Sequence, residues 1–200
     1  SLALGEAILA RGCVEAQAAA AAFDAWMRGK PVDIGNTVRR NLIQFRKTGN
    51  PEAPASEHDA GNGAAMRILP VALACYGRPP EMAVFASRAQ AHVTHHNELS
   101  DAACETLMFM VHDLLAGRDA GEVQRERADE LVRRHPVFAY SKKRCDNPSG
   151  YIVDTMQAVF QAFFATASFE ECLLDVVNRG AREQRWLLEL RQAVLASTRE

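Results

Sequence analysis

A glycine-hinged turn that runs into an apolar stretch is the part of the sequence best suited to bind a phosphate. Residues 61–70 read Gly-Asn-Gly-Ala-Ala-Met-Arg-Ile-Leu-Pro. Glycine accepts left-handed backbone angles and lets a bound group approach closely, and the amides that open a following helix would face outward at its positive end. The same pattern fits an ordinary loop before a helix, which is the commoner meaning of a short glycine motif.

Acidic, imidazole and aromatic side chains elsewhere could complete a site for a sugar phosphate. Asp33 precedes an apolar periodic run, so it could be a catalytic carboxylate or a helix N-cap. His95 lies beside His92 and His96, and this group could line a cleft or belong to the surface or core. Tyr151 opens an amphipathic stretch, so its ring could stack on a base or pack in the core. Hydrolysis of an N-glycosidic bond needs such a phosphate seat, a stacking surface and carboxylates near the sugar carbon.

The spacing of these side chains predicts no metal site. His92 and His96 stand at positions i and i+4, but no His-Glu-x-x-His pattern surrounds them. Two hard divalent ions would need several oxygen ligands that converge. The acids that remain are scattered along the chain, at Asp33, Asp59, Asp101 and Asp154.

Four stretches in a fixed order together resemble the ADP-ribosylglycohydrolase family, and within it the branch that activates dinitrogenase reductase. They are PVDIGNTVRR at 31–40, the glycine turn at 61–70, VTHHNELSDAA at 93–103 and GYIVDTMQ at 150–157. The resemblance covers about residues 1–180. It implies an all-helical fold, a hydrolase of ADP-ribosyl-arginine on a protein such as dinitrogenase reductase, and ADP-ribose and the ADP-ribosylated protein as partners.

The resemblance also assigns roles to single residues. It implies Asp33 as the catalytic carboxylate beside the ribose and the departing guanidinium, and Asn36, three residues on, would share its face of a helix. The diphosphate is expected at the glycine turn, one histidine near the ligand, and one tyrosine stacked on the adenine. The ligand-binding residues implied in this way are Asn36, Asn62, Gly63, Ala64, His95 and Tyr151.

Family members hold paired magnesium or manganese ions on two loops that this sequence lacks. A Thr-Asp-Asp-Thr type loop precedes the helix that residues 1–5 resemble. A Gly-Gly-Asp-x-Asp-Thr loop follows the helix that ends near Asn178, where this chain passes directly into residues 181–200, which resemble the family's terminal helix. We therefore expect a domain that is incomplete at the N-terminus and near the C-terminus, without metal ligands and with impaired catalysis. The alternative is a non-catalytic module that binds ADP-ribose or a nucleotide.

The composition fits one cytoplasmic domain. The chain has 200 residues, of which 48% are hydrophobic, and a net charge of −2, which gives no basic field for nucleic acid. Its five cysteines are odd in number and far apart, which suits reduced thiols. No apolar run approaches the roughly 20 residues that span a bilayer, and no leader opens the sequence, so we expect no membrane span.

Apolar residues recur at helical spacing along most of the chain, and no segment alternates with a period of two for long enough to indicate a strand. We expect a charge-laced surface segment at 118–134 and helices near 2–12, 16–27, 33–45, 66–73, 81–91, 98–115, 151–164, 169–177 and 183–196. The sequence thus predicts an all-α, single compact multi-helix domain over residues 1–200.

Overall fold

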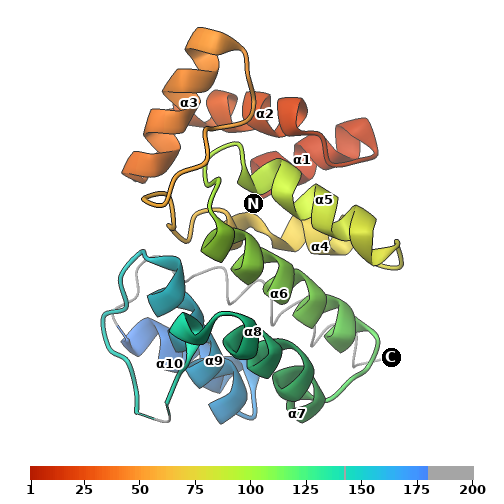
Figure 1. Cartoon of the computed structure of the whole chain (residues 1–200), viewed down its shortest axis with the longest axis vertical. Coiled ribbons are helices and arrows are strands. Elements are labelled where there is room, and N and C mark those ends of the chain that lie inside the picture. The colour runs from red at the N-terminus through yellow and green to blue at the C-terminus, as the bar shows by residue number, and fades with distance from the viewer. Residues whose placement is uncertain (142, 180–200) are drawn as a thin grey trace. The chain divides into compact units, whose positions relative to one another are not determined.

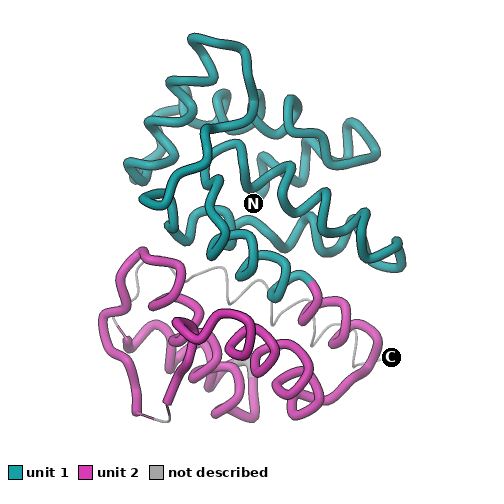
Figure 2. The backbone as a smooth tube through the Cα atoms, in the orientation of Figure 1, with its two compact units in different colours: residues 1–108 teal, residues 109–200 magenta. Residues whose placement is uncertain are grey.

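The computed structural model describes residues 1–141 and 143–179, and it is built of helices and loops (Figure 1). The predicted all-α fold is confirmed. The helix expected at 183–196 lies outside the described residues, so the extent of the domain, 1–200, stays a prediction. The chain forms two compact units, residues 1–108 and 109–200 (Figure 2).

The first unit begins with the two helices expected near 2–12 and 16–27, which form a hairpin. Helices α1 and α2 pack against each other, and Gly12 ends α1 with a left-handed φ of 73°. Gly49 ends α3 in the same way, with a φ of 72°. This conformation costs glycine little, which is why both helices stop at a glycine. The elements of the unit are α1 Leu2–Arg11, α2 Ala16–Arg28, α3 Asn36–Thr48, α4 Leu69–Cys75, α5 Pro80–Ala91 and the start of α6 Glu98–Leu115.

The stretch after the glycine turn differs from the single helix expected at 66–73. A 3₁₀ turn, Ala65–Arg67, precedes α4, which starts at Leu69 and has Pro70 in its first turn. Proline has no amide hydrogen, so Pro70 cannot donate the hydrogen bond to Met66 that an α-helix running on from residue 66 would need. The apolar residues Ile68, Val71 and Ala72 are fully buried, as expected for this segment.

The second unit continues α6 and adds short helices around a long apolar one. The elements are α7 Ala120–Val123, a π turn Gln124–Ala128, α8 Asp129–Arg134, a 3₁₀ turn Pro136–Phe138, α9 Ile152–Ala165 and α10 Phe169–Asn178. Helix α9 buries Met156, Val159 and Phe160 completely. Segment 118–134 exposes most of its charges while it buries Val123 and Leu131, as predicted. None of the described helices has the length and apolar character needed to span a membrane.

Candidate functional site

Arg67 is a buried cation at the centre of the first unit. Its residue is only 8% exposed. Nε donates to Gln90 Oε1 at 2.7 Å, Nη1 to the Gly63 carbonyl at 3.1 Å, and Nη2 to the Gln90 carbonyl at 2.9 Å and to Thr94 Oγ1 at 2.8 Å. These acceptors are all neutral, and within residues 1–141 and 143–179 no carboxylate forms an ion pair with Arg67. The guanidinium is therefore held firmly without a counter-ion.

The charge of Arg67 survives its burial. Burial lowers the pKa of the guanidinium to about 10, so it stays protonated at neutral pH. Its Cζ lies 4.4 Å from the centre of the Phe23 ring, and the ring's face stabilises a cation. Burial, with Asp101 nearby, raises the pKa of the Cys104 thiol to about 12, so this neighbour adds no negative charge. The positive charge of Arg67 is therefore not neutralised by a direct contact.

His95 adjoins this cation and is held in the neutral form. The residue is 2% exposed, and burial, followed by the charges of Arg67 and Arg40, lowers its pKa to about 3. Thr94 Oγ1 lies 2.7 Å from His95 Nδ1. Thr94 Oγ1 also accepts from Arg67. When the Thr94 hydroxyl donates its own proton to Nδ1, the ring hydrogen of His95 is on Nε2.

Gly63 is required by the close approach of the His95 ring. A Cβ at Gly63 would lie 2.7 Å from His95 Cε1, 3.0 Å from His95 Nε2 and 3.6 Å from Val38 Cγ2. The backbone of Gly63 is not left-handed. Of the two properties that suit glycine to this turn, tolerance of left-handed angles is not used at Gly63, and close approach is used toward the His95 ring. The three motifs at 31–40, 61–70 and 93–103 thus meet at Gly63, since Val38 belongs to the first.

A second buried polar group joins the same segments. Asp59, which is 2% exposed, pairs with Arg40 of α3. Asn41 Nδ2 donates to Asp59 Oδ2 at 3.2 Å and to the Thr94 carbonyl at 2.7 Å. These bonds fix α3, the segment before the glycine turn, and the turn that carries His95 in one arrangement. The carboxylate of Asp59 is thereby engaged in holding the site together.

Asp33 and Asn36 are exposed at the start of α3. The N-cap of α3 is Gly35, and no side chain caps the helix, so the interpretation of Asp33 as an N-cap is wrong. Because α3 begins at Asn36, Asp33 lies in the preceding loop, and the shared helical face expected for the two residues does not exist. Their roles toward a ligand stay predictions.

The other residues assigned by the family resemblance fall into both units. In the first, Asn62 is buried at 5% exposure and Ala64 is fully buried, so Ala64 could contribute only its backbone. In the second, Tyr151 is 40% exposed and directly precedes α9, which leaves its ring outside the core. Asp154 accepts a hydrogen bond from Ser149 Oγ at 2.5 Å. The ligand roles of Asn62, Gly63, Ala64, His95 and Tyr151 stay predictions.

One group of side chains that could ligate a metal ion is found among the described residues, and sequence spacing did not predict it. Glu52 joins His92 and His96, with one ligand atom of each within 4.8 Å of the others. The group offers two imidazoles and one carboxylate, whereas a magnesium or manganese pair needs a cluster of oxygen ligands. The described residues therefore do not fit the pair of hard ions that the family resemblance implies.

Sequence reasoning also missed Arg67 and its partners Gln90 and Thr94. The available signal was a single charged residue in the otherwise apolar stretch 64–73. A charge in such a stretch has to be buried with partners, because an unpaired buried charge is very costly. Its partners lie more than twenty residues further along the chain, where spacing gives no hint of them.

The sequence of this chain is similar to those of known proteins. Residues 1–183 match the model of the ADP-ribosylglycohydrolase family. The chain is 45% identical over 180 residues to an ADP-ribosyl-[dinitrogen reductase] glycohydrolase of Rhodospirillum rubrum, which covers 90% of this chain and 60% of that protein. It is 31% identical over 159 residues to the ADP-ribosylarginine hydrolase Tri1 of Serratia proteamaculans, covering 76% of this chain and 43% of that protein.

A solved structure shares the fold. It is described as an ADP-ribosylglycohydrolase-related protein complex and matches with a TM-score of 0.72 at 24% identity, over 99% of this chain and 78% of that one. The present chain spans 60% or less of the length of the two curated relatives. The family match over nearly the whole chain and the 45% identity lead to one conclusion: the chain belongs to the ADP-ribosylglycohydrolase family.

Proposed function

We propose that the protein hydrolyses the N-glycosidic bond between ADP-ribose and an arginine side chain of another protein. Family membership and the names of the two relatives support this reaction. The greater identity to the Rhodospirillum rubrum protein favours dinitrogenase reductase as the substrate, and hence a role in the regulation of nitrogen fixation.

The observation that carries the proposal is the buried positive centre beside the glycine turn. ADP-ribose carries a diphosphate, and a cation in a site of low polarity attracts an anion far more strongly than it would in water. Arg67 supplies that cation and touches Gly63 through its carbonyl oxygen. His95 adds an Nε2–H donor on the Gly63 side, since that atom lies 3.0 Å from where a Gly63 Cβ would stand. Asn62 and the backbone of Ala64 complete the proposed diphosphate seat.

Asp33 is the candidate for the chemical step. Cleavage of the bond develops positive charge at the ribose C1, which a nearby carboxylate stabilises while it can also activate water. The loop of Asp33 leads into α3, whose Val38 adjoins Gly63. We propose that the exposed carboxylate of Asp33 acts on the ribose, with Asn36 of the same motif as a further ligand-binding residue. Tyr151 is proposed to stack on the adenine through its exposed ring.

Release of ADP-ribose tests this function. The whole protein is incubated with a protein that carries ADP-ribosyl-arginine, and free ADP-ribose is measured. Asp33→Asn should slow turnover by about 100-fold or more, because it removes the charge that acts in the chemical step. Glu6→Gln, which changes another exposed acid, should leave turnover unchanged. Equal turnover in the wild type and Asp33→Asn would refute the role of Asp33.

A non-catalytic ADP-ribose-binding module is the second candidate. It is favoured by the lack of an oxygen-ligand cluster among residues 1–141 and 143–179. A thermal melt with ADP-ribose, with and without manganese, separates the two candidates. Ligand at 100 times its dissociation constant stabilises the folded state by about 2.7 kcal/mol. If ADP-ribose stabilises the protein equally with and without manganese, and no ADP-ribose is released from the modified protein, the protein is a non-catalytic binding module.

A further inference from the structure

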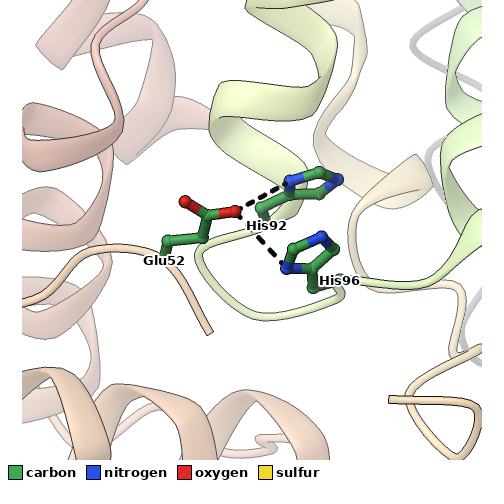
Figure 3. Close-up of side chains that lie close together, drawn as sticks. All are labelled: Glu52, His92 and His96. Atoms are coloured by element: carbon green, nitrogen blue, oxygen red, sulfur yellow. Dashed lines mark ion pairs between the residues drawn. The ribbon is translucent and has the colours of Figure 1, made fainter. Parts of the chain in front are cut away.

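Two histidine rings and a carboxylate face one another next to the turn that carries His95 (Figure 3). Glu52 belongs to the loop after α3, His92 follows the last residue of α5, and His96 lies in the turn before α6. Glu52 Oε1 is 3.7 Å from His92 Nδ1 and 3.5 Å from His96 Nδ1. Ligand atoms about 2.0–2.2 Å from a tetrahedral ion are separated by roughly 3.4 Å. The observed separations are therefore close to those of a bound ion.

The partner of His92 directs a lone pair toward Glu52. His92 Nε2 lies 2.8 Å from Asp101 Oδ2. In a neutral ring this contact places the hydrogen on Nε2, which leaves Nδ1 as a free electron-pair donor on the Glu52 side. A carboxylate behind a histidine in this way fixes the ring and strengthens it as a metal ligand. The other oxygen, Asp101 Oδ1, is buried and has no hydrogen-bond partner in the part of the chain that the structure describes.

His96 needs one rearrangement to become a ligand. Its Nδ1 lies 2.8 Å from the Ala53 carbonyl, so the ring hydrogen is on Nδ1. When Nδ1 binds an ion, this hydrogen bond is lost and the hydrogen passes to Nε2, so the imidazole stays neutral. The two rings are stacked with centroids 3.8 Å apart and planes 16° apart, and they must tilt for both lone pairs to meet at one point. Both rings are partly exposed, at 17% for His92 and 26% for His96, which leaves room for that tilt.

We propose that Glu52, His92 and His96 bind one divalent ion of the zinc class, with Asp101 orienting His92. Two imidazoles and a carboxylate form a ligand set that suits Zn²⁺ or Co²⁺ and that Mg²⁺ and Mn²⁺ do not favour. The carboxylates of Glu52 and Asp101 supply two negative charges for the ion. Arg88, the cation near Asp101, is itself paired with Glu105 at 2.7 Å. The proposal does not depend on the proposed hydrolysis.

A bound ion would clamp the loop of Glu52 to the turn of His95. The two segments are already joined by Ala53 N–H donating to the His92 carbonyl at 2.9 Å and Ser56 N–H donating to the His96 carbonyl at 3.0 Å. The same loop leads to Asp59 and the glycine turn. The ion would therefore stabilise the segments that hold His95 in place.

Calorimetric titration of the whole protein with Zn²⁺, in an excess of Mg²⁺ that occupies any site for hard ions, tests the proposal. We expect one Zn²⁺ per chain, and Glu52→Gln should weaken its binding by at least about 10-fold, because it removes a charged ligand. Glu57→Gln alters an exposed acid of the same loop and is the matched control. Equal Zn²⁺ affinity in the wild type and Glu52→Gln, or equal loss in both variants, would overturn the proposal.

The role of the histidines is tested with Co²⁺, whose visible absorption reports its coordination. We expect intense bands typical of a four-coordinate nitrogen and oxygen site, which His96→Gln abolishes and His58→Gln, at an exposed histidine of the Glu52 loop, retains. Asp101→Asn should weaken binding by about 10–100-fold while the bands persist, as expected of a residue that orients a ligand. Bands that survive in His96→Gln would place the ion elsewhere and refute the site.

Discussion

Each compact unit places an arginine over a phenylalanine ring, but only one of the two arginines has an acidic partner. In the second unit, Arg127 lies 5.2 Å from the centre of the Phe109 ring. It donates to both oxygens of Asp113, from Nε at 2.6 Å and from Nη2 at 3.0 Å. In the first unit, Arg67 lies 4.4 Å from the Phe23 ring and has only neutral acceptors.

The difference is that between an ion pair and a buried cation without a counter-ion, and the second is what the proposed binding of an anion requires. Arg127 keeps 32% of its side chain exposed, and its charge is neutralised where it stands, so it joins α6 to the π turn. Arg67 is almost fully buried, and its charge is left uncompensated. Burying a charge without a counter-ion costs free energy, and a bound ligand of opposite charge can offset that cost. Buried groups with perturbed pKa values are for this reason candidates for functional sites. The first unit accordingly contains the proposed diphosphate seat.

Replacing each arginine by methionine tests this comparison and should give the largest effect. Arg67→Met leaves Gln90 Oε1, Thr94 Oγ1 and the Gly63 carbonyl without the donor that Arg67 provides. Because each unsatisfied buried group costs about 1–3 kcal/mol, we expect the free energy of unfolding to fall by about 4 kcal/mol.

Arg127→Met should cost about 1–2 kcal/mol, because Arg118 Nη1 still lies 3.4 Å from Asp113 Oδ1. Chemical denaturation measures the free energy of unfolding of both variants. An equal loss in the two would show that both arginines contribute equally to stability and would contradict the comparison. The affinity for ADP-ribose, measured by thermal melts with increasing ligand, should fall in Arg67→Met and not in Arg127→Met.

A pair of glycines sharpens the comparison at a smaller scale. Gly63→Ala would place a Cβ 2.7 Å from the buried His95 ring, and such overpacking costs about 1–3 kcal/mol. Gly121→Ala in α7 meets only the ends of flexible side chains, Asp119 Oδ1 at 3.1 Å and Arg125 Nη1 at 3.3 Å. It should change stability by less than about 1 kcal/mol, since alanine also favours the helix. A tolerated Gly63→Ala, seen in an unchanged denaturation midpoint, would contradict the close-approach explanation.

The helices could be predicted from sequence because their signal is local. Apolar residues such as Leu42 in α3 and Met156 in α9 recur with the helical period and are fully buried. The break between Arg67 and Leu69 was missed, although Pro70 was a local signal for it. The family resemblance supplied the residues assigned to the ligand, and the structure brings three of its motifs together at Gly63.

The polar contacts of the site could not be predicted, because they join residues far apart in the sequence. Glu52 lies about forty residues before His92, so no spacing rule connects them. The N-cap interpretation of Asp33 was wrong because the helix starts two residues after it would for a capping aspartate, at Asn36 behind Gly35. For Arg67, which is buried without a counter-ion, the sequence shows the charge but not the neutral acceptors that the fold brings to it.

Lowering the pH should lower the free energy of unfolding, because His95 is neutral in the folded protein. The folded ring has a pKa of about 3, whereas the unfolded ring takes up a proton near pH 6.5. The stability is therefore complete above pH 6.5 and falls as the pH drops toward 3, by at most about 1.4 kcal/mol per unit and by about 2 kcal/mol at pH 5.

Urea denaturation at a series of pH values, in the wild type and in His95→Gln, isolates this contribution. Glutamine does not titrate and keeps a donor near the position of Nε2, so the difference between the two proteins should shrink as the pH falls. A difference that stays constant between pH 7 and pH 5 would mean that His95 titrates alike in the folded and unfolded chain.

The smallest effect is expected at a helix cap of the second unit. Ser168 Oγ accepts from the Glu171 amide at 3.2 Å, and Glu171 Oε2 accepts from the Ser168 amide at 3.3 Å. These two hydrogen bonds form a capping box at the N-terminus of α10. Ser168→Ala should cost about 1 kcal/mol of unfolding free energy, and Ser168→Asp should restore it, because aspartate caps as well as serine. ADP-ribose affinity should not change in either variant. A loss of affinity in Ser168→Ala without loss of stability would mean that the N-terminus of α10 affects ligand binding, which would contradict the purely structural role expected for this cap.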